Sequence, residues 1–184
     1  MIVPDSRDQL FDDVLVLRSQ RDDAVAFDEL VARWQERLWR HARRVTGDED
    51  AAWDVVQEAW VAMVKGLKRL EAPELFPAWA YRVVGNKAID WIRRRQSQRK
   101  MERQALQEAA GNPQSQPAAI DVEAEALREA LGRLPAEQRA LLSLKYAEGF
   151  GVEEIANIFG VPEGTIKSRL YYAREALRQA MKDG

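Results

Sequence analysis

The chain has 184 residues and a mass of 21.0 kDa, and 46% of its residues are apolar, which is enough for one ordinary domain or two small ones with a packed core. No apolar run approaches the roughly 18 residues that a membrane span needs, and the acidic start lacks the pattern of a signal peptide, so we expect a soluble cytoplasmic protein. Cysteine is absent and His41 is the only histidine, which excludes disulfides, thiol catalysis, histidine triads and most metal sites. We expect no metal ion and no cofactor.

Charge is distributed unevenly along the chain, although the formal net charge is only −2. Residues 1–30 carry a net charge of −5, residues 82–103 carry +6 and residues 165–182 carry +4. Two basic segments in separate halves suggest two contacts with one polyanion, such as a nucleic acid. For either segment alone, a solvated helix face is an equally good interpretation.

The N-terminal half is expected to form a bundle of helices. An apolar residue recurs at helical spacing over residues 27–45, and the tripeptide Thr46-Gly47-Asp48 ends this first helix and can cap the next. We expect the acidic segment 1–24 to extend the first helix; the alternative is that it regulates the domain beside it. A loop is expected over residues 66–77, followed by a third helix over about 78–95. The core stripe of the second helix is expected to contain Trp53, Val56, Trp60 and Val64, and that of the third Trp79, Val83 and Trp91.

The C-terminal half is also predicted to be helical, after a flexible linker over residues 98–122 that is rich in glycine, proline and polar residues at its centre. Helices are expected around residues 127–134, from Pro135 through Tyr146, over residues 152–159 and over about 163–181. The last two are separated by Gly160-Val161-Pro162, which gives the pattern of a helix-turn-helix. No segment has the alternating pattern of a strand, so the fold class is all-α, with two small helical domains.

The last helix has the residue types of a DNA recognition helix. An apolar line through Ile166, Leu170, Ala173 and Leu177 must pack on the preceding helix, which leaves the other faces outward. Recognition helices enter the major groove by their first residues, while later cations meet phosphates. The residues expected to contact DNA here are Thr165, Lys167, Ser168, Arg169, Tyr172 and Arg174. The competing interpretation is a surface helix in a generic three-helix bundle.

Residues 131–177 resemble the promoter-binding C-terminal region of bacterial RNA polymerase sigma factors. The resemblance is carried by Leu134-Pro135 with Arg139, by Glu154-Ile155-Ala156, and by Gly164-Thr165-Ile166-Lys167-Ser168-Arg169. Helix-turn-helix regulators of other families share parts of this pattern, so this half alone leaves a stand-alone transcriptional regulator open.

The N-terminal half resembles the same family. One segment, Asp54-Val55-Val56-Gln57-Glu58 before Ala59-Trp60, is similar to the polymerase-binding segment of sigma factors. A second, similar to the segment that opens the promoter, is marked by Phe76, Trp79, Tyr81-Arg82, Asn86, Asp90 and Arg93-Arg94-Arg95. Two such domains with a short linker match the layout of the extracytoplasmic-function (ECF) sigma factors. This implies a region 2 domain over residues 1–97, the linker over 98–122 and a region 4 domain over 123–184.

The resemblance assigns polymerase binding to Asp54, Gln57 and Glu58, which share one helix face by their spacing and could meet a basic surface. That surface is implied to be the clamp coiled coil of the largest polymerase subunit, and the flap of the second-largest subunit is the second implied contact. The chain departs from the commoner family pattern at Ala51 and Trp53, which stand in place of acidic residues. Fewer charges there could weaken or retune polymerase binding, and we favour core packing as the role of Trp53.

Opening a promoter requires aromatic faces and cations that hold unpaired bases. We expect Trp34, Trp60, Trp79 and Trp91 to belong to the core instead, because they fall on apolar stripes. The loop at about residues 71–77 is implied to form the pocket for a flipped base of the downstream element, with Asn86 beside it. The residues expected to contact the downstream element and to assist melting are Tyr81, Arg82, Asn86, Lys87, Arg93 and Arg94.

The sequence therefore predicts a sigma factor that binds core RNA polymerase and directs initiation by recognising the −35 and −10 promoter elements in DNA. An anti-sigma factor is a further candidate partner, and no membrane insertion is expected. Two alternatives stay open: a stand-alone helix-turn-helix regulator and a sigma mimic that titrates an anti-sigma factor. We do not expect an enzyme, because no phosphate-binding loop, metal cluster or nucleophile–base pair can be assembled; His41, among arginines, is expected to be a solvated neighbour.

Overall fold

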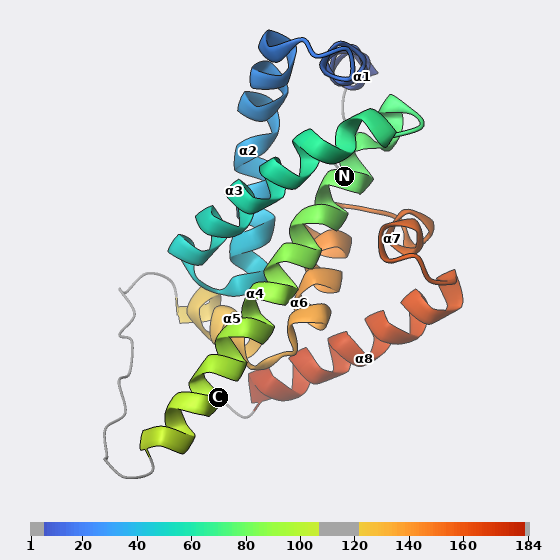
Figure 1. The fold of residues 1–184 in the computed structure, drawn as a ribbon. Helices are drawn as coiled ribbons and strands as arrows, with labels where there is room; N and C mark the ends of the chain where they lie inside the picture. Colours follow the sequence, from blue (N-terminus) through green and yellow to red (C-terminus); the bar gives the residue numbers. More distant parts are fainter. Residues whose placement is uncertain (1–5, 107–121, 183–184) are drawn as a thin grey trace.

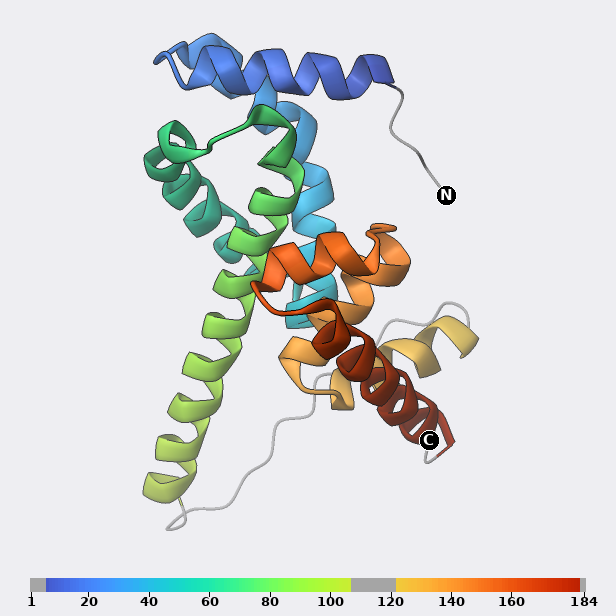
Figure 2. The same cartoon turned by 90° about the vertical axis from the view of Figure 1, so that its right-hand side faces the viewer.

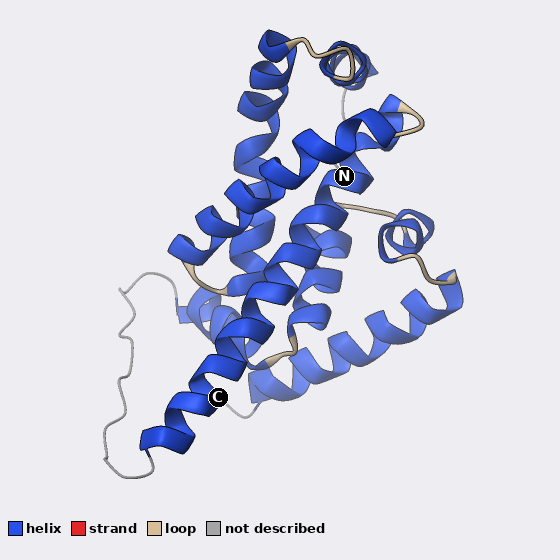
Figure 3. Cartoon of the chain, viewed as in Figure 1, coloured by secondary structure: helices blue, strands red, loops and turns tan. Residues whose placement is uncertain are grey.

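The structure is a computed structural model and describes residues 6–106 and 122–182. Helices and the turns between them make up all of these described residues, and no strand occurs among them (Figure 3). The all-α fold class predicted from the sequence is confirmed.

Four long helices form the N-terminal half (Figure 1). They are α1 (Ser6–Ser19), α2 (Ala24–Thr46), α3 (Glu49–Gly66) and α4 (Phe76–Leu106). Two short 3₁₀ turns, η1 (Leu67–Arg69) and η2 (Pro73–Leu75), occupy the connection between α3 and α4. Helices α2, α3 and α4 pack on one another in pairs, and α1 packs on α2.

The C-terminal half begins with α5 (Val122–Arg133) and α6 (Ala136–Leu142). Helix α6 runs directly into a π-helical turn, η3 (Ser143–Ala147), so helical backbone reaches the end that the sequence predicts. Helices α7 (Val152–Phe159) and α8 (Glu163–Lys182) follow and contact each other.

The C-terminus of α2 and the N-terminus of α3 are fixed by the residues that the sequence predicts. Gly47 adopts a φ of 72° at the C-terminus of α2, a left-handed conformation that glycine reaches without the steric cost of a side chain. Asp48 then caps α3, because its Oδ1 accepts a hydrogen bond of 3.0 Å from the backbone N–H of Ala51. Asp23 caps α2 in the same way through Ala26.

The expectation that segment 1–24 extends the first long helix is wrong. Helix α1 ends at Ser19, and the chain reverses through a turn in which Asp22 adopts a φ of 65°. As a result α1 lies across one end of the bundle (Figure 2). The reason is that Asp23 competes as a helix cap, which starts a new helix at Ala24.

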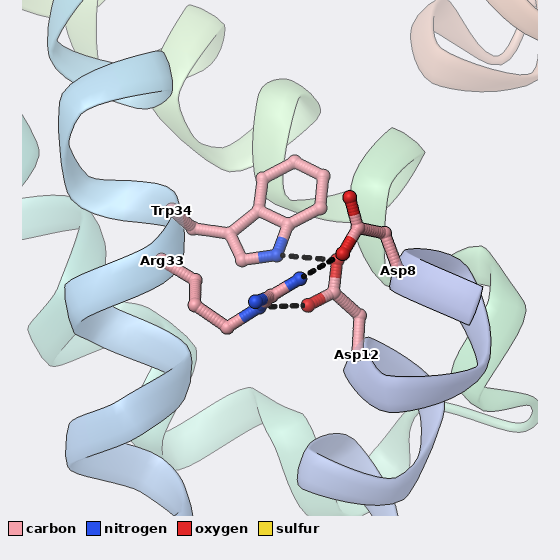
Figure 4. A network of polar contacts seen from close by, with 4 residues as sticks. All are labelled: Asp8, Asp12, Arg33 and Trp34. Carbon is pink, nitrogen blue, oxygen red and sulfur yellow. Dashed lines mark hydrogen bonds and ion pairs between the residues drawn. The ribbon is translucent and has the colours of Figure 1, made fainter. Parts of the chain in front are cut away.

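A polar network holds α1 on α2 (Figure 4). Asp12 is buried, and its two oxygens accept hydrogen bonds of 2.7 Å from Arg33 Nε and 3.1 Å from Trp34 Nε1. Asp8 adds a longer bond of 3.3 Å to Arg33 Nη2. Both oxygens of the buried carboxylate are therefore satisfied, which is the condition for burying a charge without a large penalty.

Helix α4 is longer than predicted. It continues through Leu106 and so enters the segment 98–122 for which we expect a linker, because residues 96–106 are almost all good helix formers. The centre of that linker, residues 107–121, lies outside the described residues.

Buried apolar residues of the two halves form one continuous cluster. Trp34 and Trp60 belong to it as predicted, whereas Trp79 and Trp91 are only half-buried against it. Helix α2 contacts α6, and α4 contacts α7, so the C-terminal half packs directly on the N-terminal half. This packing decides which of the predicted site residues reach solvent.

None of the helices within residues 6–106 and 122–182 combines the length and the apolar character that crossing a membrane requires.

Candidate nucleic-acid and polymerase interface

Helices α7 and α8 form the helix-turn-helix that the sequence predicts. Gly160 ends α7 with a φ of 65°, and its backbone N–H bonds to the carbonyl of Ala156. Ile166, Leu170 and Ala173 of α8 are buried as expected, whereas Leu177 is half-buried. The buried line fixes the rotation of α8 about its axis and thereby the face that it presents to solvent.

The residues predicted to contact the upstream element lie mainly on that solvent face. Thr165 is half-buried, and the exposed ones are Lys167, Ser168, Arg169, Tyr172 and Arg174. The Ser168 hydroxyl donates a 2.7 Å hydrogen bond to the carbonyl of Gly164, and Lys167 Nζ lies 3.3 Å from Glu163 Oε2. Exposed ion pairs of this kind contribute little and exchange readily for a phosphate partner.

The residues predicted to contact the downstream element all lie on α4, but they are in different environments. Arg82 and Asn86 are exposed, and Lys87 is half-buried. Arg93 and Arg94 are exposed and pair with carboxylates: Arg93 Nη2 lies 2.8 Å from Glu137 Oε1, and Arg94 Nη2 lies 3.6 Å from Glu58 Oε2.

Tyr81 is not available to DNA in this arrangement, which corrects the expectation that it is a surface contact. Its side chain is buried, and its hydroxyl donates a 2.5 Å hydrogen bond to Glu148 Oε2. Arg44 Nη1 lies 2.6 Å from the other oxygen of Glu148. Burial and the neighbouring Glu148 carboxylate raise the pKa of the Tyr81 hydroxyl far above its ordinary value. Tyr81 thus belongs to the contact between the two halves.

His41 is fully buried, so the expectation that it is a solvated neighbour of arginines is wrong. Its Nδ1 lies 2.9 Å from the hydroxyl of Ser143, which comes from the other half of the chain. Its ring meets that of Tyr81 edge to face at 5.2 Å. Burial, and secondarily the charge of Arg44, lower the pKa of His41 to about 3. Position 41 comes three residues after Leu38 and four before Val45, so helical periodicity places it on the apolar stripe of α2. The polar residue type and the neighbouring arginines, not the spacing, gave the wrong expectation.

Both predicted DNA-contact sets border one groove between the halves, with a volume of about 710 Å³. Arg93 lines it from α4, and Arg169 and Tyr172 line it from α8. In this packed arrangement Arg93 of the downstream set therefore faces the same space as Arg169 and Tyr172 of the upstream set.

The segment predicted to hold a flipped base contains the short turn η2. Phe76 is buried in the core, while Leu75 is exposed. Helix α1 contacts η2, and the Gln20 amide donates hydrogen bonds of 3.0 and 2.9 Å to the carbonyls of Leu67 and Leu70. The N-terminal segment therefore supports this connection, a role that no pattern around Gln20 indicates.

The predicted polymerase-binding residues lie on the outer face of α3, where Asp54, Gln57 and Glu58 are all exposed. Glu58 Oε2 lies 3.3 Å from Lys87 Nζ of α4. Within the described part of the chain, Asp54 forms no comparable ion pair, so its charge faces solvent.

The expected core packing of Trp53 is wrong, because 38% of its surface is exposed. It stands on the outer face of α3 and stacks on Trp39 of α2, with ring centres 5.4 Å apart and planes 30° apart. Val64 of the same predicted stripe is also exposed. Helix α3 carries apolar residues on its exposed face as well as on the face toward the core. The spacing of apolar residues therefore does not tell which of the two faces is buried.

The described residues hold no group of three or more side chains that could bind a metal ion. Sequence reasoning missed Trp39, Arg44, Ser143 and Glu148, whose partners come from other elements, so sequence spacing carries no signal for them.

The family model described as ECF sigma factor matches residues 20–183. The chain is 30% identical to the RNA polymerase sigma-H factor of Pseudomonas aeruginosa, with 93% of this chain and 94% of that protein covered. It is 33% identical to the ECF RNA polymerase sigma-E factor of Escherichia coli, with 92% and 94% covered. It is 36% identical to the ECF sigma factor SigL of Mycobacterium tuberculosis, with 79% and 83% covered.

Two solved structures resemble the fold. CnrH in complex with the cytosolic domain of CnrY is 25% identical, with a TM-score of 0.67 and coverage of 94% of this chain and 98% of that one. The sigma factor RpoE of Bartonella quintana, in complex with the anti-sigma factor NepR, is 25% identical, with a TM-score of 0.59 and coverage of 85% and 96%.

Proposed function

This chain belongs to the ECF sigma factor family, and we propose that it directs core RNA polymerase to promoters by recognising an upstream and a downstream DNA element and helping to melt the DNA. The observation that carries the proposal is the row of exposed polar and cationic side chains at the start of α8, held outward by the buried line on its opposite face. Transcription in bacteria takes place in the cytoplasm, which is where we propose that the protein acts.

For the upstream element, α8 enters the major groove by its N-terminal residues. Lys167, Ser168 and Arg169 meet base edges, with Thr165 and Tyr172 beside them, and Arg174 meets phosphates further along the helix. An arginine can bond two acceptors of a guanine, which makes Arg169 the side chain with the greatest capacity to discriminate bases.

For the downstream element, Arg82, Asn86, Lys87, Arg93 and Arg94 provide a cationic and polar stretch along α4. Cations neutralise the backbone of a separated strand while the connection that contains η2 accommodates a base. Tyr81 joins this set only when the two halves separate, because Glu148 and the C-terminal half cover it.

For polymerase binding, Asp54 and Gln57 on α3 meet the basic clamp coiled coil of the largest subunit, with Glu58 next to them, and the region 4 domain meets the flap of the second-largest subunit. An anti-sigma factor is the proposed regulatory partner, since the two solved relatives are in complex with CnrY and with NepR. The domain limits 1–97, 98–122 and 123–184 are part of the same proposal.

The test is transcription from fragmented genomic DNA by sigma-free core polymerase supplied with the purified protein. We expect start sites that share a paired upstream and downstream motif. Arg169→Ala should change the base preference within the upstream motif, whereas Arg174→Ala, the matched cation further along α8, should weaken all sites alike.

Two other results would contradict the proposal. DNA binding without polymerase binding would indicate a stand-alone regulator, and polymerase binding without initiation at any salt concentration would indicate a sigma mimic. An unaltered preference in Arg169→Ala would remove that residue from base recognition.

A further inference from the structure

Two tryptophans stack on the outside of the N-terminal bundle. Trp39 comes from α2 and Trp53 from α3, and their ring centres lie 5.4 Å apart. The guanidinium of Arg43 lies 5.4 Å from the centre of the Trp39 ring and its Nη2 lies 3.7 Å from Glu49 Oε2. Trp39 is thus held in place from α2, and it supports Trp53 at the surface.

Trp53 is part of a longer apolar strip along the exposed face of α3. Val64 follows it at i+11 on the same helix face, and the polar Gln57 lies between them at i+4. Val61 is adjacent, and both valines are more than half exposed. Asp50 and Asp54 border the strip and are exposed too. This face therefore combines apolar side chains with unshielded carboxylates.

Such a face fits a partner of definite chemistry. Tryptophan is the residue most enriched among interface side chains that dominate binding, particularly where a second ring limits its mobility. A guanidinium can stack on the indole while it bonds to a neighbouring carboxylate. The complementary surface is consequently one that carries arginine or lysine beside apolar residues.

We propose that Trp53, supported by Trp39, anchors the polymerase-docking face of α3 by packing against a cationic and apolar helical surface of the core polymerase. This inference rests on the proposed function and adds to it a residue at which the commoner family pattern has an acidic side chain. At position 53, dispersion and cation–π attraction replace a contact between opposite charges. A second copy of the chain fits less well, because it would bring the same carboxylates together.

The test compares affinities for core polymerase at several salt concentrations. The full chain carries a dye on a cysteine introduced at Met181, an exposed position on α8, and binding is followed by fluorescence anisotropy. We expect Trp53→Ala to weaken binding about tenfold or more without changing the salt dependence. Asp54→Ala should weaken binding and reduce the salt dependence, because it removes a charge. Val25→Ala removes another exposed apolar side chain, at the start of α2, and should leave the affinity unchanged.

Trp53→Phe retains a ring and should recover most of the affinity, and far-ultraviolet circular dichroism should show the same helix content in every variant. If Trp53→Ala binds core polymerase as tightly as the parent while Asp54→Ala binds more weakly, Trp53 is not an anchor and the proposed function stands. If the parent does not bind core polymerase, the proposed function itself is wrong, and the anchor with it. A dimer in sedimentation that Trp53→Ala abolishes would show that a second copy occupies the face, which also overturns the inference.

Discussion

His41 lies where the two halves of the chain meet, and its surroundings disfavour the charged form of its imidazole. It is fully buried, and its Nδ1 contacts Ser143. The charged and titratable groups around it are Arg44 from α2, Tyr81 and Arg82 from α4, and Glu148 after η3, whereas α6 and α7 present only apolar side chains. Among the residues that the structure describes, no carboxylate contacts the imidazole, so none of them offsets the cost of burying its charged form.

We predict that protonation of His41 destabilises the fold. Its pKa is lowered to about 3 in the folded chain, against an ordinary 6.5, so the folded state binds fewer protons and stability falls as the pH drops below 6.5. Between pH 7.5 and 5.5 the unfolding equilibrium constant should rise about tenfold, or about 1.4 kcal/mol. Urea unfolding at several pH values measures the stability of the parent and of His41→Gln, whose side chain cannot titrate. An equal pH dependence of stability in both proteins would show that His41 is not its source.

Two adjacent aspartates of α1 are predicted to have opposite effects. Asp12→Ala leaves the Trp34 indole without its partner and Arg33 with only the longer bond to Asp8, which should cost about 1.5–3 kcal/mol. Asp13 is different: burial, and then the charges of Glu74 and Asp12, raise the pKa of its carboxyl, so the ionised form is disfavoured. Asp13→Ala should therefore stay within about 0.5 kcal/mol of the parent or exceed it in stability. Thermal unfolding compares the stabilities of the two variants. Equal losses of stability would contradict the prediction that only Asp12 stabilises the fold.

At the level of elements, the angle between α7 and α8 depends on the left-handed conformation of Gly160. No atom lies within 4 Å of a Cβ built there, so space is not the constraint; the φ of 65° is. We predict that Gly160→Ala costs about 1–2 kcal/mol. The control is Gly132→Ala near the end of α5, where no neighbour would be touched either and alanine should be neutral or stabilising. Chemical denaturation measures the free energy of unfolding of both variants. A loss of stability in Gly132→Ala but not in Gly160→Ala would show that the φ of Gly160 is not the constraint.

At the level of the whole molecule, the packing of one half on the other determines which of the proposed DNA-contact residues are exposed. Glu148 is the polar centre of that contact, since it pairs at once with the Tyr81 hydroxyl and with Arg44. Because Tyr81 is covered there, the packed arrangement excludes the contact that we propose between Tyr81 and a separated strand.

We predict that Glu148→Ala separates the halves. The loss leaves the Tyr81 hydroxyl and the Arg44 guanidinium unpaired, at a cost of about 1–3 kcal/mol to the contact. The chain lacks cysteine, so dyes can be attached at cysteines introduced for Lys65 on α3 and Met181 on α8, and energy transfer between them measures the separation. We expect a longer distance in Glu148→Ala and no change in Glu153→Ala, an exposed glutamate of α7. An identical distance in both variants would show that Glu148 does not hold the halves together.

The helix limits follow from local sequence. Asp48 caps the helix that begins beside it, and glycine adopts the left-handed backbone conformation of Gly160 without help from distant residues. The start of α3 and the end of α7 were therefore predictable from a few residues. The exposed face of α8 was predictable for a similar reason: a buried line through Ile166 and Leu170 determines the opposite side by helical geometry alone.

Tertiary structure decided the environments of Tyr81, His41 and Trp53. Tyr81 bonds to Glu148 and His41 contacts Ser143, and both partners are far away in the sequence. Packing of the C-terminal half removes the two side chains from water. Trp53 is the reverse case, because an apolar residue on an apolar helix is assigned to the core unless the positions of the other helices are known. The sequence by itself determined most of the helices, the turns at Gly47-Asp48 and Gly160, and the family, because these depend on local chemistry and on pattern. Burial depends on which surfaces meet, and only the packed chain decides that.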